Sequence, residues 1–281
     1  MTDKKELLRV ILKTLEELPP MPANVLKLRR AIADQNVNYN QLTPILHEDP
    51  SMCADLLKVA NSSVMGIGHG VDTIDEAIRY FGMSALVDFI SVSCSDKIIK
   101  QSFSAVKHLN EYSQHSREVS LATSFMAKAF KMNQHDREVF TLTGLLHDIG
   151  RLIILLFTEE RSYCEEALKM NWEDVHGLVD DEKELFGIDH AELGKLICEK
   201  WQFPARITNA VKMHHSPLAN GKIHKDGLIL FLSEIITVES TPDSVLKVAL
   251  PPGMLQKLGV TVDDLIEARY QYKDALALIG G

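Results

Sequence analysis

The sequence lacks several features that would assign it to particular classes of protein. Its four cysteines are far apart and show no CxxC spacing, which fits reduced, buried thiols rather than a disulfide framework. No apolar run approaches the roughly 18 residues of a membrane span, and the first ten residues hold no signal-peptide core. We therefore expect a cytoplasmic protein with no membrane partner.

Positive charge is also scarce. Lysine and arginine number 30 against 39 acidic residues, so the net charge is −9 and a nucleic-acid partner is not expected. The acidity is concentrated between Glu159 and Glu192. Such a stretch is either the solvated outer face of helices or a docking surface for a basic partner.

The alternation of polar and apolar residues that marks β-strands is absent, and a helical period runs through almost the whole chain. Asp49 is a plausible N-cap with Pro50 at the first helical position. Thr73 and Glu76 have capping-box spacing, and Gly82 offers a stop after that helix. The sequence therefore predicts an all-α fold.

A polar, weakly periodic stretch from Lys97 to Lys107 suggests a boundary within the chain. We expect a two-lobed molecule, with an N-terminal helical lobe over residues 1–100 and a helical bundle over residues 101–281.

Two strongly apolar segments contain acidic residues. Leu142 to Phe157 is hydrophobic nearly all round, which is typical of a buried helix, yet it carries His147 and Asp148. Gly227 to Val238 is similar and carries Glu234. An unpaired buried charge costs several kcal/mol, so these side chains must be paired or bound to a ligand.

Four further histidines are spaced so that they face inward. His115 shares a helical stripe with Val119 and Met126, and His190 heads one with Leu193 and Ile197. The other two, His214 and His215, follow Ile207 and Ala210 on a third helix.

Such histidines are either hydrogen-bonded core residues or metal ligands. Five imidazoles and two carboxylates suit zinc, iron or manganese, and would suffice for two divalent metal ions. No organic cofactor is expected.

The motif GLLHDIGRL resembles the HD signature of metal-dependent phosphohydrolases. This motif and five further segments are together similar to the HDOD domain of bacterial signalling proteins. The segments are LPPMPANVLKLRRAI, EDPSMCADLLKVANSS, TIDEAIRYFGMSAL, HSREVSLATSFMA and FGIDHAELGKLICEKWQFPARITNAVKMHHSP. The resemblance covers residues 18–217 and implies an HD-type metal-dependent phosphohydrolase-like bundle in the C-terminal half.

The resemblance also implies a set of metal ligands. These are His115, the His147–Asp148 pair, a last acidic residue matched by Glu234, and the further histidines of the HD-GYP branch, matched by His190, His214 and His215. The family's last ligand is normally Asp, and Glu reaches one methylene further. The GYP tripeptide is missing after the double histidine, so a cyclic-di-GMP phosphodiesterase is not expected.

Two functions follow as hypotheses. One is a signal-transduction module that binds a signalling protein or a small ligand and retains a metal that braces the bundle. The other is a metal-dependent phosphohydrolase acting on a phosphorylated small molecule, nucleotide or phosphodiester. In that second case Asp148 would bridge the metals and Arg151 would neutralise phosphate charge or form an ion pair, with Lys107 or Lys212 as weaker candidates for the same role.

Overall fold

The computed structural model of this chain describes residues 4–19, 27, 38–47, 50–61, 70–106, 109–157, 175–219, 221–238, 242–248, 250 and 253–280. Over these residues the molecule is almost entirely helical, and the predicted all-α fold is confirmed. One short antiparallel hairpin interrupts the helices, β1 (Leu218–Ala219) with β2 (Lys222–Ile223).

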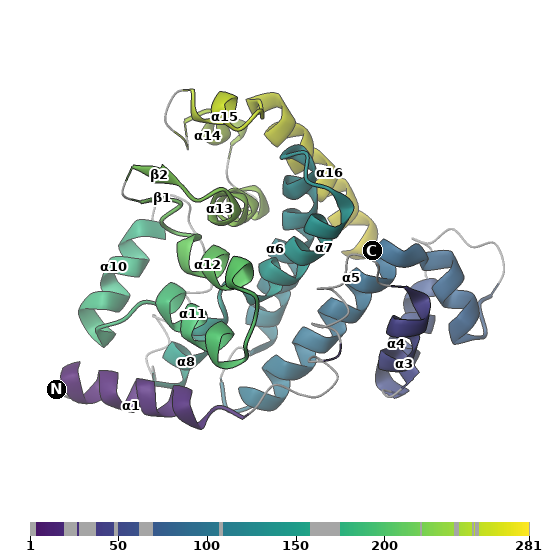
Figure 1. Ribbon diagram of the computed structural model, residues 1–281, viewed down its shortest axis with the longest axis horizontal. Helices are drawn as coiled ribbons and strands as arrows, with labels where there is room; N and C mark the ends of the chain where they lie inside the picture. The colour runs from purple at the N-terminus through teal and green to yellow at the C-terminus, as the bar shows by residue number, and fades with distance from the viewer. Residues whose placement is uncertain are drawn as a thin grey trace.

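The helices follow one another along the chain in an order that Figure 1 traces by colour. They are α1 (Lys4–Glu17), α3 (Tyr39–His47), α4 (Pro50–Ala60), α5 (Ile74–Ser102), α6 (Leu109–Ala129), α7 (Gln134–Leu146), α8 (Ile149–Phe157), α10 (Val175–Phe186), α11 (His190–Lys200), α12 (Ala205–Met213), α13 (Lys225–Thr237), α14 (Asp243–Val248), α15 (Met254–Lys257) and α16 (Val262–Gly280).

The helix starts follow the local sequence signals. Pro50 begins α4 as predicted, and its expected cap Asp49 lies outside the described residues. The Thr73 hydroxyl accepts a hydrogen bond from the Glu76 backbone N–H at 3.2 Å, so the predicted cap of α5 is confirmed. Gly82 breaks the helix with φ 69°, but the helix resumes at once, so α5 continues to Ser102.

Helix α6 lies at the centre of the packing. It contacts α7, α13 and α16, while α11 packs against α8 and α12, and α12 packs against α13. In Figure 1, α3 and α4 lie at the right with one end of α5, and α10, α11 and α12 lie at the left. The elements that carry the inward histidines therefore converge in the middle of the molecule.

Two apolar clusters form the core. The larger one includes Leu42 and Ile90 as well as Ile153 and Val211, so it contains residues from both sides of position 100. The smaller one joins α6, α13 and α16. The division into lobes at residue 100 stays a prediction.

The segment Val139–Phe157 is long and apolar enough to cross a membrane by length and composition, with a mean hydropathy of 1.7. It is 89% buried inside the protein, as expected for helices of a protein core. Its apolar residues are therefore covered by the other helices of the bundle.

Candidate metal centre

The His147–Asp148 pair lies at the junction between α7 and α8. The sequence predicted it inside one continuous helix, which was wrong in this detail. The backbone tightens here, because the Arg151 N–H bonds the Asp148 carbonyl three residues back at 2.8 Å. His147 Nδ1 lies 2.7 Å from the Gly144 carbonyl oxygen, so His147 Nε2 points away from its own helix.

Asp148 is the central group of the site. Its Oδ2 lies 3.3 Å from His147 Nε2 and 3.6 Å from Nε2 of His115 on α6. Its Oδ1 lies 3.3 Å from His190 Nε2 and 3.5 Å from His214 Nε2. Each carboxylate oxygen therefore faces a different pair of imidazoles.

His190 is the first residue of α11, and a second acidic residue fixes its orientation. Glu182 Oε2 accepts bonds from the His190 backbone N–H at 2.8 Å and from ring Nδ1 at 2.6 Å. A carboxylate behind a ligand histidine sets its tautomer and raises its basicity. His190 Nε2 is thereby directed toward Asp148.

His214 and His215 follow the end of α12. His214 Nδ1 bonds the Val211 carbonyl oxygen, which turns its Nε2 toward Asp148. His215 Nε2 lies 2.7 Å from His190 Nε2, and its Nδ1 lies 3.9 Å from Oε2 of Glu234. Both rings thus join the group around Asp148.

Glu234 comes from α13 and completes the site on the side of His147. Its Oε1 lies 2.9 Å from His147 Nε2 and 3.8 Å from His214 Nε2. Glu234 stands where the family's pattern has Asp, and it reaches the other ligands despite the longer side chain.

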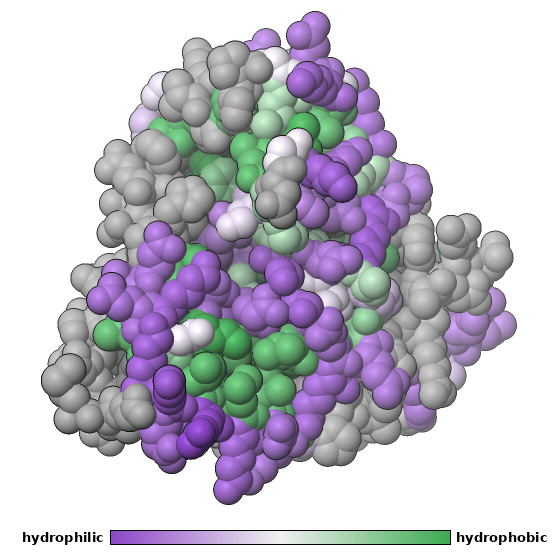
Figure 2. Space-filling view, turned by 60° about the vertical axis from the view of Figure 1, so that its left-hand side comes forward, coloured by the Kyte–Doolittle hydropathy of each residue, from purple (hydrophilic) through white to green (hydrophobic). Residues whose placement is uncertain are grey.

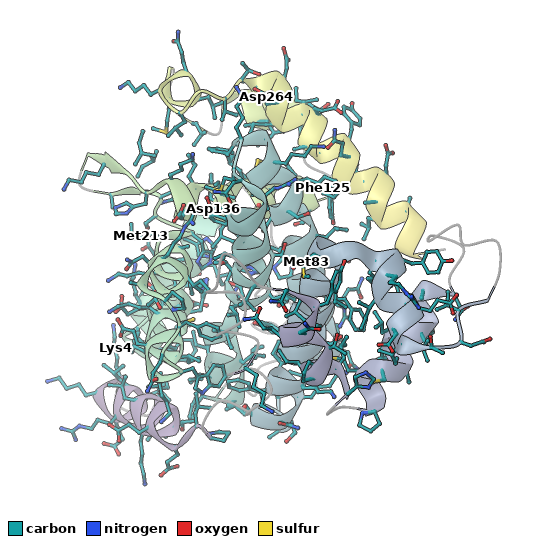
Figure 3. All side chains as sticks on the ribbon, turned by 45° about the vertical axis from the view of Figure 1, so that its right-hand side comes forward. Lys4, Met83, Phe125, Asp136, Met213 and Asp264 are labelled. Carbon is teal, nitrogen blue, oxygen red and sulfur yellow. The ribbon has the colours of Figure 1, made fainter. Side chains whose placement is uncertain are left out.

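Two glycines allow the elements that carry these residues to approach closely. A Cβ atom on Gly150 of α8 would lie 2.0 Å from the His190 carbonyl oxygen, and one on Gly227 of α13 would lie 2.8 Å from Met213. Neither distance is possible for a larger residue without a shift of the backbone. Arg206 of α12 also forms ion pairs with Asp136 of α7 and Asp226 of α13, which hold these three helices together. Figure 3 labels Asp136 and Met213, the last residue of α12.

The predicted ligands therefore all meet in one place, which we call the histidine cluster: His115, His147, Asp148, His190, His214, His215 and Glu234. They divide into two sets of four that share Asp148. The His115 quartet consists of His115, His147, Asp148 and Glu234, and the His190 quartet of Asp148, His190, His214 and His215. Within each quartet, one ligand atom from every residue lies within 4.8 Å of the others.

The donor atoms of the cluster fit a metal ion. Eight of its buried nitrogen and oxygen atoms make no hydrogen bond of good geometry, including both oxygens of Asp148 and both of Glu234, although Asp148 Oδ2 and Glu234 Oε1 lie within 3.0 Å of Arg151 Nη1 and His147 Nε2. An unsatisfied buried polar atom costs about 1–3 kcal/mol. Eight such atoms in one place therefore indicate that the cluster binds a further group. Imidazole and carboxylate donors in this mixture suit zinc, iron or manganese.

The charges of the cluster are strongly coupled. Burial raises the pKa of Asp148, but the Arg151 guanidinium, followed by His147 and His190, holds that pKa well below its usual value. Burial lowers the pKa of His147, but Asp148 and Glu234 raise it to about 10. Burial raises the pKa of Glu234, but His214 and His147 hold it below its usual value, so both acids are kept in their ionised form.

Known proteins share the fold of this chain and most of its sequence pattern. A family model described as the HDOD domain matches residues 18–217, which is most of the chain. The chain belongs to the HDOD domain family. The HDOD domain protein of unknown function from Geobacter sulfurreducens has the same fold, with a TM-score of 0.72 and 21% identity over 97% of this chain and 94% of that one.

Two other solved structures with the same fold have names that refer to different functions. A candidate phosphohydrolase from Shewanella amazonensis SB2B matches with a TM-score of 0.67 and 22% identity, covering 93% of each chain. A candidate signal transduction protein from Marinobacter aquaeolei VT8 matches with a TM-score of 0.67 and 19% identity, covering 99% of this chain and 66% of that one. At these identities the likeness shows the fold alone.

An uncharacterized protein from Treponema pallidum (strain Nichols) is 22% identical over 260 residues, which is 87% of this chain. The chain spans about half (48%) of the length of that curated relative.

The ligand side chains of the histidine cluster are mostly buried. Those of His147, Asp148, His190 and His214 are fully buried, those of His215 and Glu234 are 2% exposed, and His115 is the most exposed ligand, with 15% of its side chain exposed. Two cavities lined by described residues lie elsewhere, one between α3 and α5 and one between α12 and the start of α13. Figure 2 shows an apolar area in the lower half of one face, surrounded by hydrophilic residues, and further apolar residues in the upper half.

Sequence reasoning missed Glu182. It lies in the acidic stretch interpreted as a solvated face or a docking surface, but its side chain is fully buried. The available signal was its position in an apolar stripe, because Val179 and Phe186 of α10 are buried at helical spacing on either side of it. Residues 158–174 of the acidic stretch lie outside the described residues.

The lysines considered for a phosphate-binding role do not join the cluster. Lys212 forms a surface ion pair with Glu192 at 3.0 Å, and Lys107 lies outside the described residues. Arg151 does reach the site and forms the ion pair with Asp148 at 3.0 Å.

Proposed function

We propose that this chain is a cytoplasmic signal-transduction module of the HDOD family that binds a divalent transition metal in the histidine cluster and acts by binding a partner. The partner is a signalling protein or a small ligand. The metal contributes folding energy to the bundle, because the ligand set does not exist in the unfolded chain.

The enclosure of the cluster is the observation that carries this proposal. A phosphorylated substrate must bring an oxygen to the metal, yet six of the seven ligand side chains are no more than 2% exposed. A metal in such a site is better placed to hold five helical elements together than to meet a substrate. The absence of a GYP tripeptide after His215 supports the same conclusion.

A metal-dependent phosphohydrolase is the second candidate, and the shared Asp148 favours it. One carboxylate between two ligand sets is the arrangement by which a protein places two metals side by side. When bound, such metals supply an activated water and polarise phosphoryl oxygens. In this case Asp148 would hold the ions and Arg151 would orient Asp148, and a phosphorylated small molecule, nucleotide or phosphodiester would be the substrate.

The two proposals are separated by measuring metal content and turnover on the same samples. We would purify the full chain, His147→Ala and a control, His47→Ala, which changes an exposed histidine of α3. Each is tested by elemental analysis and against a panel of phosphomonoesters, nucleotides and phosphodiesters.

The regulatory proposal predicts metal in the wild type and in His47→Ala, much less metal in His147→Ala, and turnover in none. Hydrolysis that is lost in His147→Ala and kept in His47→Ala would make the chain a phosphohydrolase. A wild type without metal would contradict the metal site in either form.

A further inference from the structure

The cavity between α3 and α5, which we call the α3–α5 cavity, is separate from the histidine cluster. Its volume is about 710 Å³, which is within the range of pockets that bind small molecules. The residues that line it belong to the described part of the chain, and none of them is a ligand of the histidine cluster. The cavity can therefore be considered as a site of its own.

The wall formed by α5 carries two opposite charges. Asp75 and Arg79 both line the cavity, one helical turn apart on the same face of the helix. Opposite charges at this spacing often form an ion pair, as Lys13 and Glu17 do on α1. Neither Asp75 nor Arg79 forms an ion pair or a hydrogen bond through its side chain in the described part of the chain. Both charges are therefore available to a ligand.

The facing wall, formed by α3, supplies uncharged polar groups and an aromatic ring. Asn40 and Thr43 line the cavity with an amide and a hydroxyl, and Tyr39, which is 40% exposed, also lines it. Pro44 lies within α3 and has no N–H to donate to the Asn40 carbonyl four residues earlier. This wall therefore offers donors and acceptors of hydrogen bonds together with a ring surface.

Both walls are anchored in the core of the protein. Ile78 of α5 lines the cavity, is 5% exposed and belongs to the larger apolar cluster. Leu42 and Leu46 of α3 belong to the same cluster and are fully buried. Because the two helices pack on a shared core, the cavity is present before any ligand binds.

The spacing of the two charges indicates which kind of ligand fits. One turn of an α-helix rises about 5.4 Å. A compact zwitterion can reach across this distance, with its ammonium group against Asp75 and its carboxylate in charge-assisted hydrogen bonds with Arg79. A simple anion would leave Asp75 without a partner, and a simple cation would do the same to Arg79.

We infer that the α3–α5 cavity binds a free amino acid, whose ammonium group pairs with Asp75 and whose carboxylate pairs with Arg79. The polar wall and the ring of Tyr39 then surround the side chain of the ligand. This inference rests on the proposed function in one respect, namely that the partner of the module is a small ligand.

The test is isothermal titration calorimetry of the full-length protein with each standard L-amino acid in turn. Acetate and ethylamine serve as probes that carry only one of the two charges. The variants Asp75→Asn and Arg79→Met each remove one charge, and both side chains are exposed, so the fold should be retained. Circular dichroism verifies this.

Two control variants lie away from the cavity. Asp263→Asn matches Asp75→Asn, because Asp263 is also an exposed acid in the first turn of a helix, α16. Arg9→Met removes an exposed arginine of α1. Any general effect of a lost surface charge should appear in these controls as well.

We expect at least one amino acid to bind the wild type and both controls, and to bind more tightly than acetate or ethylamine. Asp75→Asn and Arg79→Met should each weaken this binding by roughly 10–100-fold, because each loses a charged hydrogen bond. Unchanged affinity in both variants would overturn the inference, as would a wild type that binds no amino acid. Acetate or ethylamine binding as tightly as the best amino acid would also overturn it.

Metal content measured on the same samples separates this inference from the proposed metal site. Protein that holds metal and binds no amino acid would contradict the inference and leave the metal site intact. Protein that binds an amino acid through Asp75 and Arg79 but holds no metal would contradict the metal site and leave the inference intact.

Discussion

At the scale of single residues, Glu182 shows how an outer carboxylate supports a ligand. Its bond to His190 Nδ1 leaves Nε2 as the donor toward Asp148. Glu182→Gln keeps the size and removes the charge, and we expect it to lower metal affinity by roughly 10–100-fold. Competition with a chromophoric chelator measures the change, and Glu184→Gln, on an exposed position of the same helix, is the control. Equal affinities in all three proteins would contradict this role.

Cys198 provides a second prediction at this scale. Burial raises the pKa of its thiol to about 12, so almost no thiolate is present at pH 8. Iodoacetamide should leave Cys198 unmodified in the native protein and alkylate it in urea, as peptide mass spectrometry can determine. Cys53 is only partly buried and should react faster in the native state. Rapid native alkylation of Cys198 would show that α11 opens readily.

The inward direction of the ligands could be predicted from the sequence, because helical spacing places His115 and His190 on apolar stripes. The residue-scale detail could not. Which nitrogen of each ring faces Asp148 depends on hydrogen bonds to Gly144, Glu182 and Val211 that exist only in the folded chain.

At the scale of elements, the contact between α8 and α11 positions Asp148 against His190. Gly150→Ala places a methyl group where the His190 carbonyl oxygen already lies, so the helices must separate. We expect a loss of roughly 1–3 kcal/mol in the free energy of unfolding, measured by urea denaturation, together with a lower metal content.

Gly70→Ala is the control for this experiment. Its Cβ would lie 3.8 Å from the nearest heavy atom, which is ordinary van der Waals contact. An unchanged urea midpoint in Gly150→Ala would show that the two helices are not held at this distance.

Element boundaries were predicted only in part. Capping signals located the starts of α4 and α5 correctly, since they depend on neighbouring residues. The break between α7 and α8 was missed, because the apolar residues continue through it without interruption and the turn is made by backbone geometry around Asp148.

At the scale of the whole molecule, the metal should stabilise the native state, because its ligands come from α6, the α7–α8 junction, α11, the end of α12 and α13. Removing it with a chelator should lower the melting temperature, and re-adding zinc should restore it. Differential scanning calorimetry measures both steps. His147→Ala should already melt at the lower temperature and respond little to either treatment, whereas an identical response to the wild type would contradict the prediction.

The all-α class could be predicted from the sequence because it depends on a period that recurs throughout the chain. The meeting of His115 with Glu234 was suggested by their burial and by the family resemblance, but their distance could not be predicted, since 118 intervening residues separate them and only tertiary packing decides it.

The enclosure of the cluster has a consequence in time. A fully buried ion leaves or exchanges only when the surrounding helices open, and such openings are rare for core segments. Metal occupancy would therefore reflect the ions available while the chain was folding, and would follow later changes in the cell only slowly. Occupancy of the proposed metal site would then record past metal supply through the lifetime of each molecule.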